Sequence, residues 1–93
     1  MTLNLRQQEL LRELVQNITL KFPDVQYLGF GSSPYGEQTV WVNMRVPDDE
    51  TMLAMSEYAA ELESAILVEY GYSFSIMPRR NALSNMTEAK ELV

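Results

Sequence analysis

A loop rich in glycine and serine is the part of this chain that is best suited to bind phosphate. Residues 29–37 read Gly-Phe-Gly-Ser-Ser-Pro-Tyr-Gly-Glu, and successive backbone N–H groups in such a loop can donate to an anion. Phosphoryl transfer also needs carboxylates that hold a divalent cation. The next stretch, residues 39–46, reads Thr-Val-Trp-Val-Asn-Met-Arg-Val and carries no carboxylate. The pattern indicates a phosphate scaffold without a catalyst, although a plain hairpin loop explains the same residues more simply.

Two residue types that perform much of enzyme chemistry are missing. The 93 residues include no Cys and no His, which excludes disulfides, thiolate nucleophiles, Cys or His zinc sites and imidazole relays. The acidic run Asp48-Asp49-Glu50 is explained by its position at the start of a helix. We therefore predict no catalytic residues, no metal site and no cofactor.

The charge of the chain restricts its partners. Its formal net charge is −6, so free nucleic acid is a poor partner. No apolar run reaches the roughly 18 residues that span a membrane, and residues 1–6 do not resemble a secretory signal. We expect one cytoplasmic domain that covers residues 1–93.

The first predicted element is a helix over residues 5–22. Asn4 is a suitable N-cap, with Gln7 as the reciprocal partner of a capping box. Apolar residues recur at helical spacing along this segment, and Pro23 ends it.

Two strands follow, over residues 25–30 and 39–46. The second has the clearer pattern, because Val40, Val42 and Met44 alternate with polar residues and with Trp41. Such alternation predicts that one face packs on the core and the other faces solvent or a partner.

The second half of the chain predicts a long helix, a third strand and a short helix. The long helix begins after Pro47 and ends at Gly71, a residue suited to the left-handed conformation. The third strand covers residues 72–77 and is predicted to end at Pro78. A final short helix is predicted from Asn85 to the end of the chain.

These elements predict the α+β class, in a two-layer α-β-β-α-β sandwich. Two helices would cover one face of a three-stranded, mostly antiparallel sheet. The third strand follows a helix, so it can lie parallel to one of the others. The second sheet face is left without a helix in a monomer.

In this order of elements, residues 8–80 resemble the minimal nucleotidyltransferases. That family has a Gly-Ser-x-x-x-Gly turn after its first strand, and Gly31, Ser32 and Gly36 match the turn here. The resemblance implies that Gly31 and Ser32 contact phosphate. Arg79, which follows the third strand, would add a positive charge.

The sequence departs from that family at the acids that bind its metal. Residues 40–43 read Val-Trp-Val-Asn and residues 73–75 read Ser-Phe-Ser, where the family has two acids and a third. The resemblance therefore implies a degenerate domain that binds a nucleotide or phosphate without turning it over. The element order is also similar to ferredoxin-like domains and to the regulatory dimer domain of cation diffusion exporters, whose His ligands have no counterpart here.

The open sheet face gives the other functional hypothesis. Aromatic and Arg residues are enriched in protein interfaces, and a Trp on a bare sheet face is costly to leave in water. The residues that we expect to form an interface are Trp41, Arg45, Ser73, Ser75 and Met77. The expected function is a non-catalytic interaction domain whose partner is a second copy, as a homodimer, or another protein. Alternatively, residues 81–93 fold back and cover Trp41.

Overall fold

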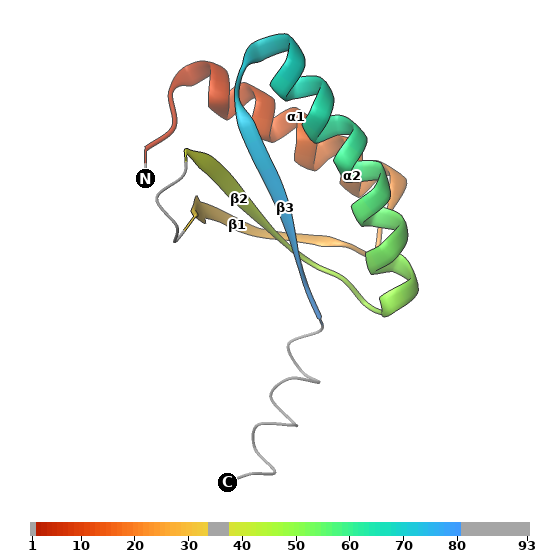
Figure 1. The fold of residues 1–93 in the computed structure, drawn as a ribbon. Coiled ribbons are helices and arrows are strands. Elements are labelled where there is room, and N and C mark those ends of the chain that lie inside the picture. Colours follow the sequence, from red (N-terminus) through yellow and green to blue (C-terminus); the bar gives the residue numbers. More distant parts are fainter. Residues whose placement is uncertain (1, 34–37, 81–93) are drawn as a thin grey trace, which may run out of the picture.

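The computed structural model describes residues 2–33 and 38–80, which fold in the predicted order α-β-β-α-β (Figure 1). The elements are α1 (Leu5–Lys21), β1 (Gln26–Ser32), β2 (Thr39–Arg45), α2 (Asp49–Tyr70) and β3 (Ser73–Arg79). The predicted α+β class is confirmed. The predicted helix that starts at Asn85 lies outside the described residues.

The three strands form one mixed sheet in the order β1-β2-β3. β1 pairs antiparallel with β2, and β2 pairs parallel with β3. Both helices lie on the same side of this sheet, which gives a two-layer sandwich (Figure 1). None of the described helices is long and apolar enough to cross a membrane.

The start of α1 follows the predicted capping box. The Asn4 side chain accepts a hydrogen bond from the Gln7 backbone N–H at 2.8 Å, and the Gln7 side chain accepts one from the Asn4 N–H at 3.0 Å. These bonds satisfy two donors that an uncapped helix would leave unpaired. The buried stripe of α1 consists of Leu10, Leu11, Leu14 and Ile18.

The central strand β2 carries the middle of the core. Val40, Val42 and Met44 are at most 1% exposed, whereas the residues that alternate with them are half-buried. This confirms the predicted alternation. The core side of the sheet is closed by Met55 and Ala59 of α2, which are also buried.

β1 extends further than predicted, to Ser32 rather than to Phe30. Gly31 pairs with Trp41 and Ser32 pairs with Val40, so pairing with β2 holds these two residues in the strand. The register shifts between Tyr27 and Gly29, and Gly29 has a φ of 129° there. Glycine adopts this conformation readily, because it has no Cβ.

β3 also passes its predicted end, because Pro78 lies inside the strand. β3 is an edge strand, and an edge tolerates a proline whose missing N–H would face away from the sheet. Pairing continues one residue further, since the Val46 N–H donates to the Arg79 carbonyl at 2.7 Å. The C-terminal end of α2, which precedes β3, lies where it was predicted, and Gly71 caps the helix there with a φ of 79°.

Candidate functional site

The sheet face that the helices leave uncovered holds all five predicted interface residues. Trp41 and Arg45 come from β2, and every one of the five is half-buried. The residues that β3 contributes are Ser73, Ser75 and Met77. Their alternate neighbours Phe74 and Ile76 are buried in the hydrophobic core. We call the uncovered surface the open face.

Several polar side chains of the open face bond to each other. The hydroxyl oxygens of Thr39 and Ser73 lie 3.0 Å apart. Arg79 donates from Nε and Nη2 to the Asn43 side-chain oxygen, at 3.3 and 3.2 Å. The Ser75 hydroxyl lies 3.9 Å from the Met77 sulfur. These bonds fix the side chains in place and leave the apolar surface of the face to Trp41 and Met77.

Arg45 differs from these polar side chains because one of its buried donors has no hydrogen-bond partner among the described residues. Its Nη1 donates to the Gln26 side-chain oxygen at 3.2 Å. Its Nε is buried and has no hydrogen-bond partner within residues 2–33 and 38–80. A buried donor without an acceptor is costly, so an acceptor supplied from outside this part of the chain would stabilise Arg45.

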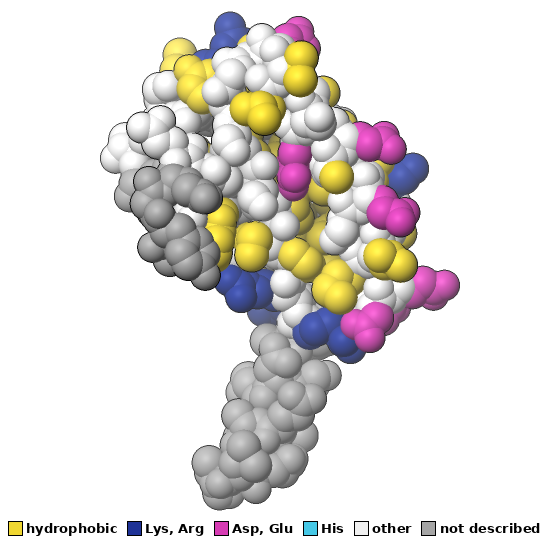
Figure 2. All heavy atoms as spheres, viewed as in Figure 1, with side chains coloured by type: hydrophobic (Ala, Val, Ile, Leu, Met, Phe, Trp, Pro, Cys, Tyr) yellow, Lys and Arg dark blue, Asp and Glu magenta, His cyan; other side chains and the backbone are white. Residues whose placement is uncertain are grey.

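Positive charge gathers at one end of the open face. Arg45 and Arg79 are register partners on adjacent strands. Arg80 follows them and pairs with Asp49 at the start of α2. Figure 2 shows basic side chains where β3 ends and acidic side chains along α2. The molecule thus has a basic sheet end beside an acidic helix.

The residues predicted to bind a ligand are not brought together. Gly31 and Ser32 pair with Trp41 and Val40, whereas Arg79 pairs with Arg45 near the other end of β2. At about 3.3 Å per residue, Val40 and Arg45 are roughly 17 Å apart along the strand. One phosphate cannot contact both ends. Gly36 lies outside the described residues.

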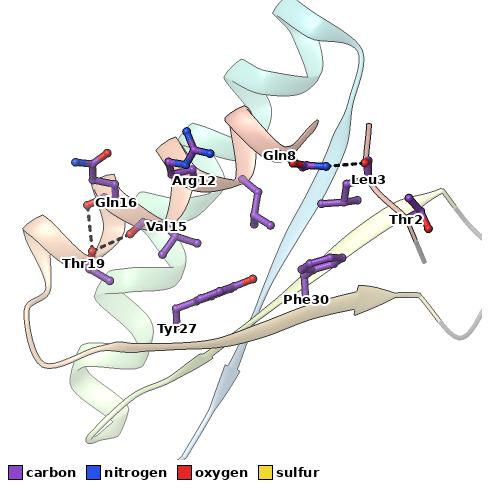
Figure 3. Close-up of a pocket in the computed structure, with 10 residues that line it drawn as sticks. Thr2, Leu3, Gln8, Arg12, Val15, Gln16, Thr19, Tyr27 and Phe30 are labelled. Carbon is purple, nitrogen blue, oxygen red and sulfur yellow. Dashed lines mark hydrogen bonds between the residues drawn. The ribbon is translucent and has the colours of Figure 1, made fainter. Parts of the chain in front are cut away.

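A groove between α1 and β1 was not predicted from the sequence. It encloses about 860 Å³, and its walls are mainly apolar. Tyr27 and Phe30 stand on β1 and point toward α1, where Val15 lies opposite (Figure 3). Partial burial there raises the pKa of the Tyr27 phenol. Aromatic residues in a glycine-rich strand are a signal for such a groove, but the bulge that orients them is not visible in the sequence.

The described residues do not contain a group of three acidic, His or Cys side chains that could hold a metal ion. We also compared the chain with protein families, curated proteins and solved structures, and found no match. The open face and the groove are therefore the surfaces of this chain that point to a function.

Proposed function

We propose that this chain is a non-catalytic, cytoplasmic interaction domain that forms a homodimer through its open face. The contact residues would be Trp41, Arg45, Ser73, Ser75 and Met77. The observation that supports this proposal is the position of Trp41, a large aromatic residue at the centre of a sheet face that neither helix covers.

The surroundings of Trp41 also favour a protein contact. Gly31 pairs with Trp41, and a Cβ added at Gly31 would meet no atom within 4 Å. A partner can therefore approach the backbone beside the indole ring. At one end of the face, the buried Nε of Arg45 needs an acceptor, and a carbonyl or carboxylate of a second copy would supply it.

Light scattering of the wild-type protein and of Trp41→Ala tests this proposal. The wild type should have twice the 10.7 kDa mass of one chain. A central Trp typically contributes about 2 kcal/mol to an interface, so the substitution should weaken dimerisation by roughly thirtyfold. Leu20→Ala is the matched control, because Leu20 is exposed on α1, in the helix layer on the opposite side of the sheet from the open face.

A monomeric wild type, or a dimer that Trp41→Ala leaves intact, would contradict the proposal. The alternative function, nucleotide or phosphate binding through Gly31, Ser32 and Arg79, has less support because these residues lie at opposite ends of the sheet. Calorimetric titration with ATP separates the two functions. Heat of binding that Ser32→Ala abolishes would favour the alternative.

A further inference from the structure

The helix layer of this fold is wider than its sheet. Packed helices lie about 8–10 Å apart and neighbouring strands about 4.8 Å apart. Two helices therefore cover a width of about 20 Å, which corresponds to about four strands, and this sheet has three. The helix layer is therefore wider than the sheet by about the width of one strand.

The groove between α1 and β1 lies where that strand would fit. One side of α1 faces α2 with Leu14 and Asn17. The opposite side faces the groove with Val15 and Thr19 (Figure 3), and Arg12 also lines the groove. The groove is thus on the outer side of α1, above the edge of the sheet that β1 forms.

The backbone of β1 offers hydrogen bonds along this edge. Successive residues of a strand direct their backbone N–H and C=O groups to opposite sides. The Val46 N–H bonds to β3, so the odd-numbered residues Trp41 and Asn43 of β2 direct these groups to β1. Their partners are Gly31 and Gly29. Phe30 alternates with these glycines, and it therefore directs its N–H and C=O away from β2, as does Ser32.

The opposite edge of the sheet is protected. On β3 the Ile76 N–H, which faces outward, donates to the Glu63 carboxylate of α2 at 2.7 Å. The next outward position along the strand is Pro78, which has no N–H. Among the described residues no side chain bonds to the β1 edge in this way. Within the part of the chain that the structure describes, β1 is therefore the edge that offers unpaired backbone groups to an added strand.

We propose that β1 and the groove bind one extended segment of a partner protein, which adds a fourth strand to the sheet beside β1. Main-chain hydrogen bonds to Phe30 and Ser32 would provide affinity, and side chains in the groove would provide specificity. This site is separate from the open face and does not depend on the proposed homodimer.

A second copy of the domain does not fit the site. The partner's β1 would bring its own α1, which lies over it in the same way. Both helices would then need the space above one strand, and a helix is about 10 Å across. A lone extended segment has no such helix.

The groove also defines the chemistry of the segment. Leu11, Val15, Tyr27 and Phe30 line it, and Tyr27 and Phe30 remain 40% and 41% exposed. Large apolar side chains at every second position of the segment would cover them. Arg12 is the charged residue on the groove wall, so an acidic residue in the segment would be favoured.

Selection of random nonapeptides displayed on phage, followed by fluorescence anisotropy with the enriched peptides, tests the proposal. Enriched sequences should alternate large apolar with polar residues and include an acid. Ser32→Pro should weaken their binding at least tenfold, because it removes the outward N–H, and Ser32→Ala should not. Arg12→Glu should weaken binding several-fold, whereas the matched reversal Arg6→Glu, outside the groove on the same helix, should not.

Circular dichroism of each variant would confirm that the fold is retained, and Arg12→Glu remains informative if Ser32→Pro does not fold. The proposal would be overturned by a selection that enriches no sequence, or by enriched peptides with helical apolar spacing. It would also be overturned if Trp41→Ala, rather than the groove variants, abolished peptide binding. A change in the mass of the protein itself on Ser32→Pro would identify a second copy as the occupant instead.

Discussion

Glu63 is an acidic residue whose charged form is disfavoured by burial in this structure. It is partly buried against β3, and desolvation raises the pKa of its carboxyl, although the hydrogen bond from the Ile76 N–H lowers it in part. A carboxyl whose pKa is raised on folding binds its proton more tightly in the folded state. Its contribution to stability is therefore greatest at low pH and declines as the pH rises through the raised pKa.

Two variants of Glu63 test this direction of the pH dependence of stability. Glu63→Gln keeps an acceptor for the Ile76 N–H without the charge, so it should change the free energy of unfolding at pH 7 by less than about 1 kcal/mol, in the stabilising direction. Glu63→Ala removes the acceptor and should destabilise by about 1 kcal/mol. Thermal unfolding between pH 4 and 7 would show the gain from Glu63→Gln shrinking as the pH falls. A stabilisation by Glu63→Gln that grows toward pH 4 would contradict the raised pKa of Glu63.

Among the elements, α1 depends most clearly on its first turn. Asn4 accepts from the Gln7 N–H and also donates to the Tyr72 hydroxyl at 3.2 Å. It therefore begins the helix and connects it to the residue that precedes β3.

We predict that Asn4→Ala lowers the free energy of unfolding by about 1 kcal/mol. In a chain of this size, that loss lowers Tm by about 4–8 °C. Asn17→Ala is the control, because Asn17 is exposed within α1 and alanine is the better helix former there. If both variants unfolded at the same temperature, the capping box would contribute nothing measurable.

At the scale of the whole molecule, the two edges of the sheet differ. Glu63 and Pro78 protect the edge at β3, whereas none of the side chains in residues 2–33 and 38–80 bonds to the outward groups of β1. The open face and the β1 edge thus give the domain two separate surfaces for two kinds of partner.

Amide hydrogen exchange would show this asymmetry directly. The Phe30 N–H points away from the sheet and the Gly31 N–H points into it, so we expect Phe30 to exchange at least about a hundredfold faster. Ile76 should resemble Gly31, because Glu63 holds its N–H. Equal exchange at Phe30 and Gly31 would mean that the β1 edge is covered in solution.

Much of the fold could be predicted from local patterns in the sequence. Asn4 with Gln7, the alternation of Val40, Val42 and Met44, and Gly71 each act within a few residues. Capping, strand alternation and the left-handed conformation of glycine have the same physical cause in any protein. The placement of Trp41 on the open face followed from that alternation.

The remaining features depended on tertiary pairing. β1 continues through Gly31 and Ser32, and β3 through Pro78, because neighbouring strands hold those residues against their local preferences. The separation of Ser32 from Arg79 follows from strand directions, and the groove follows from the width of two helices over three strands. Sequence patterns determine which face a residue occupies, but only the packed structure decides which residues meet across strands and which edge remains open.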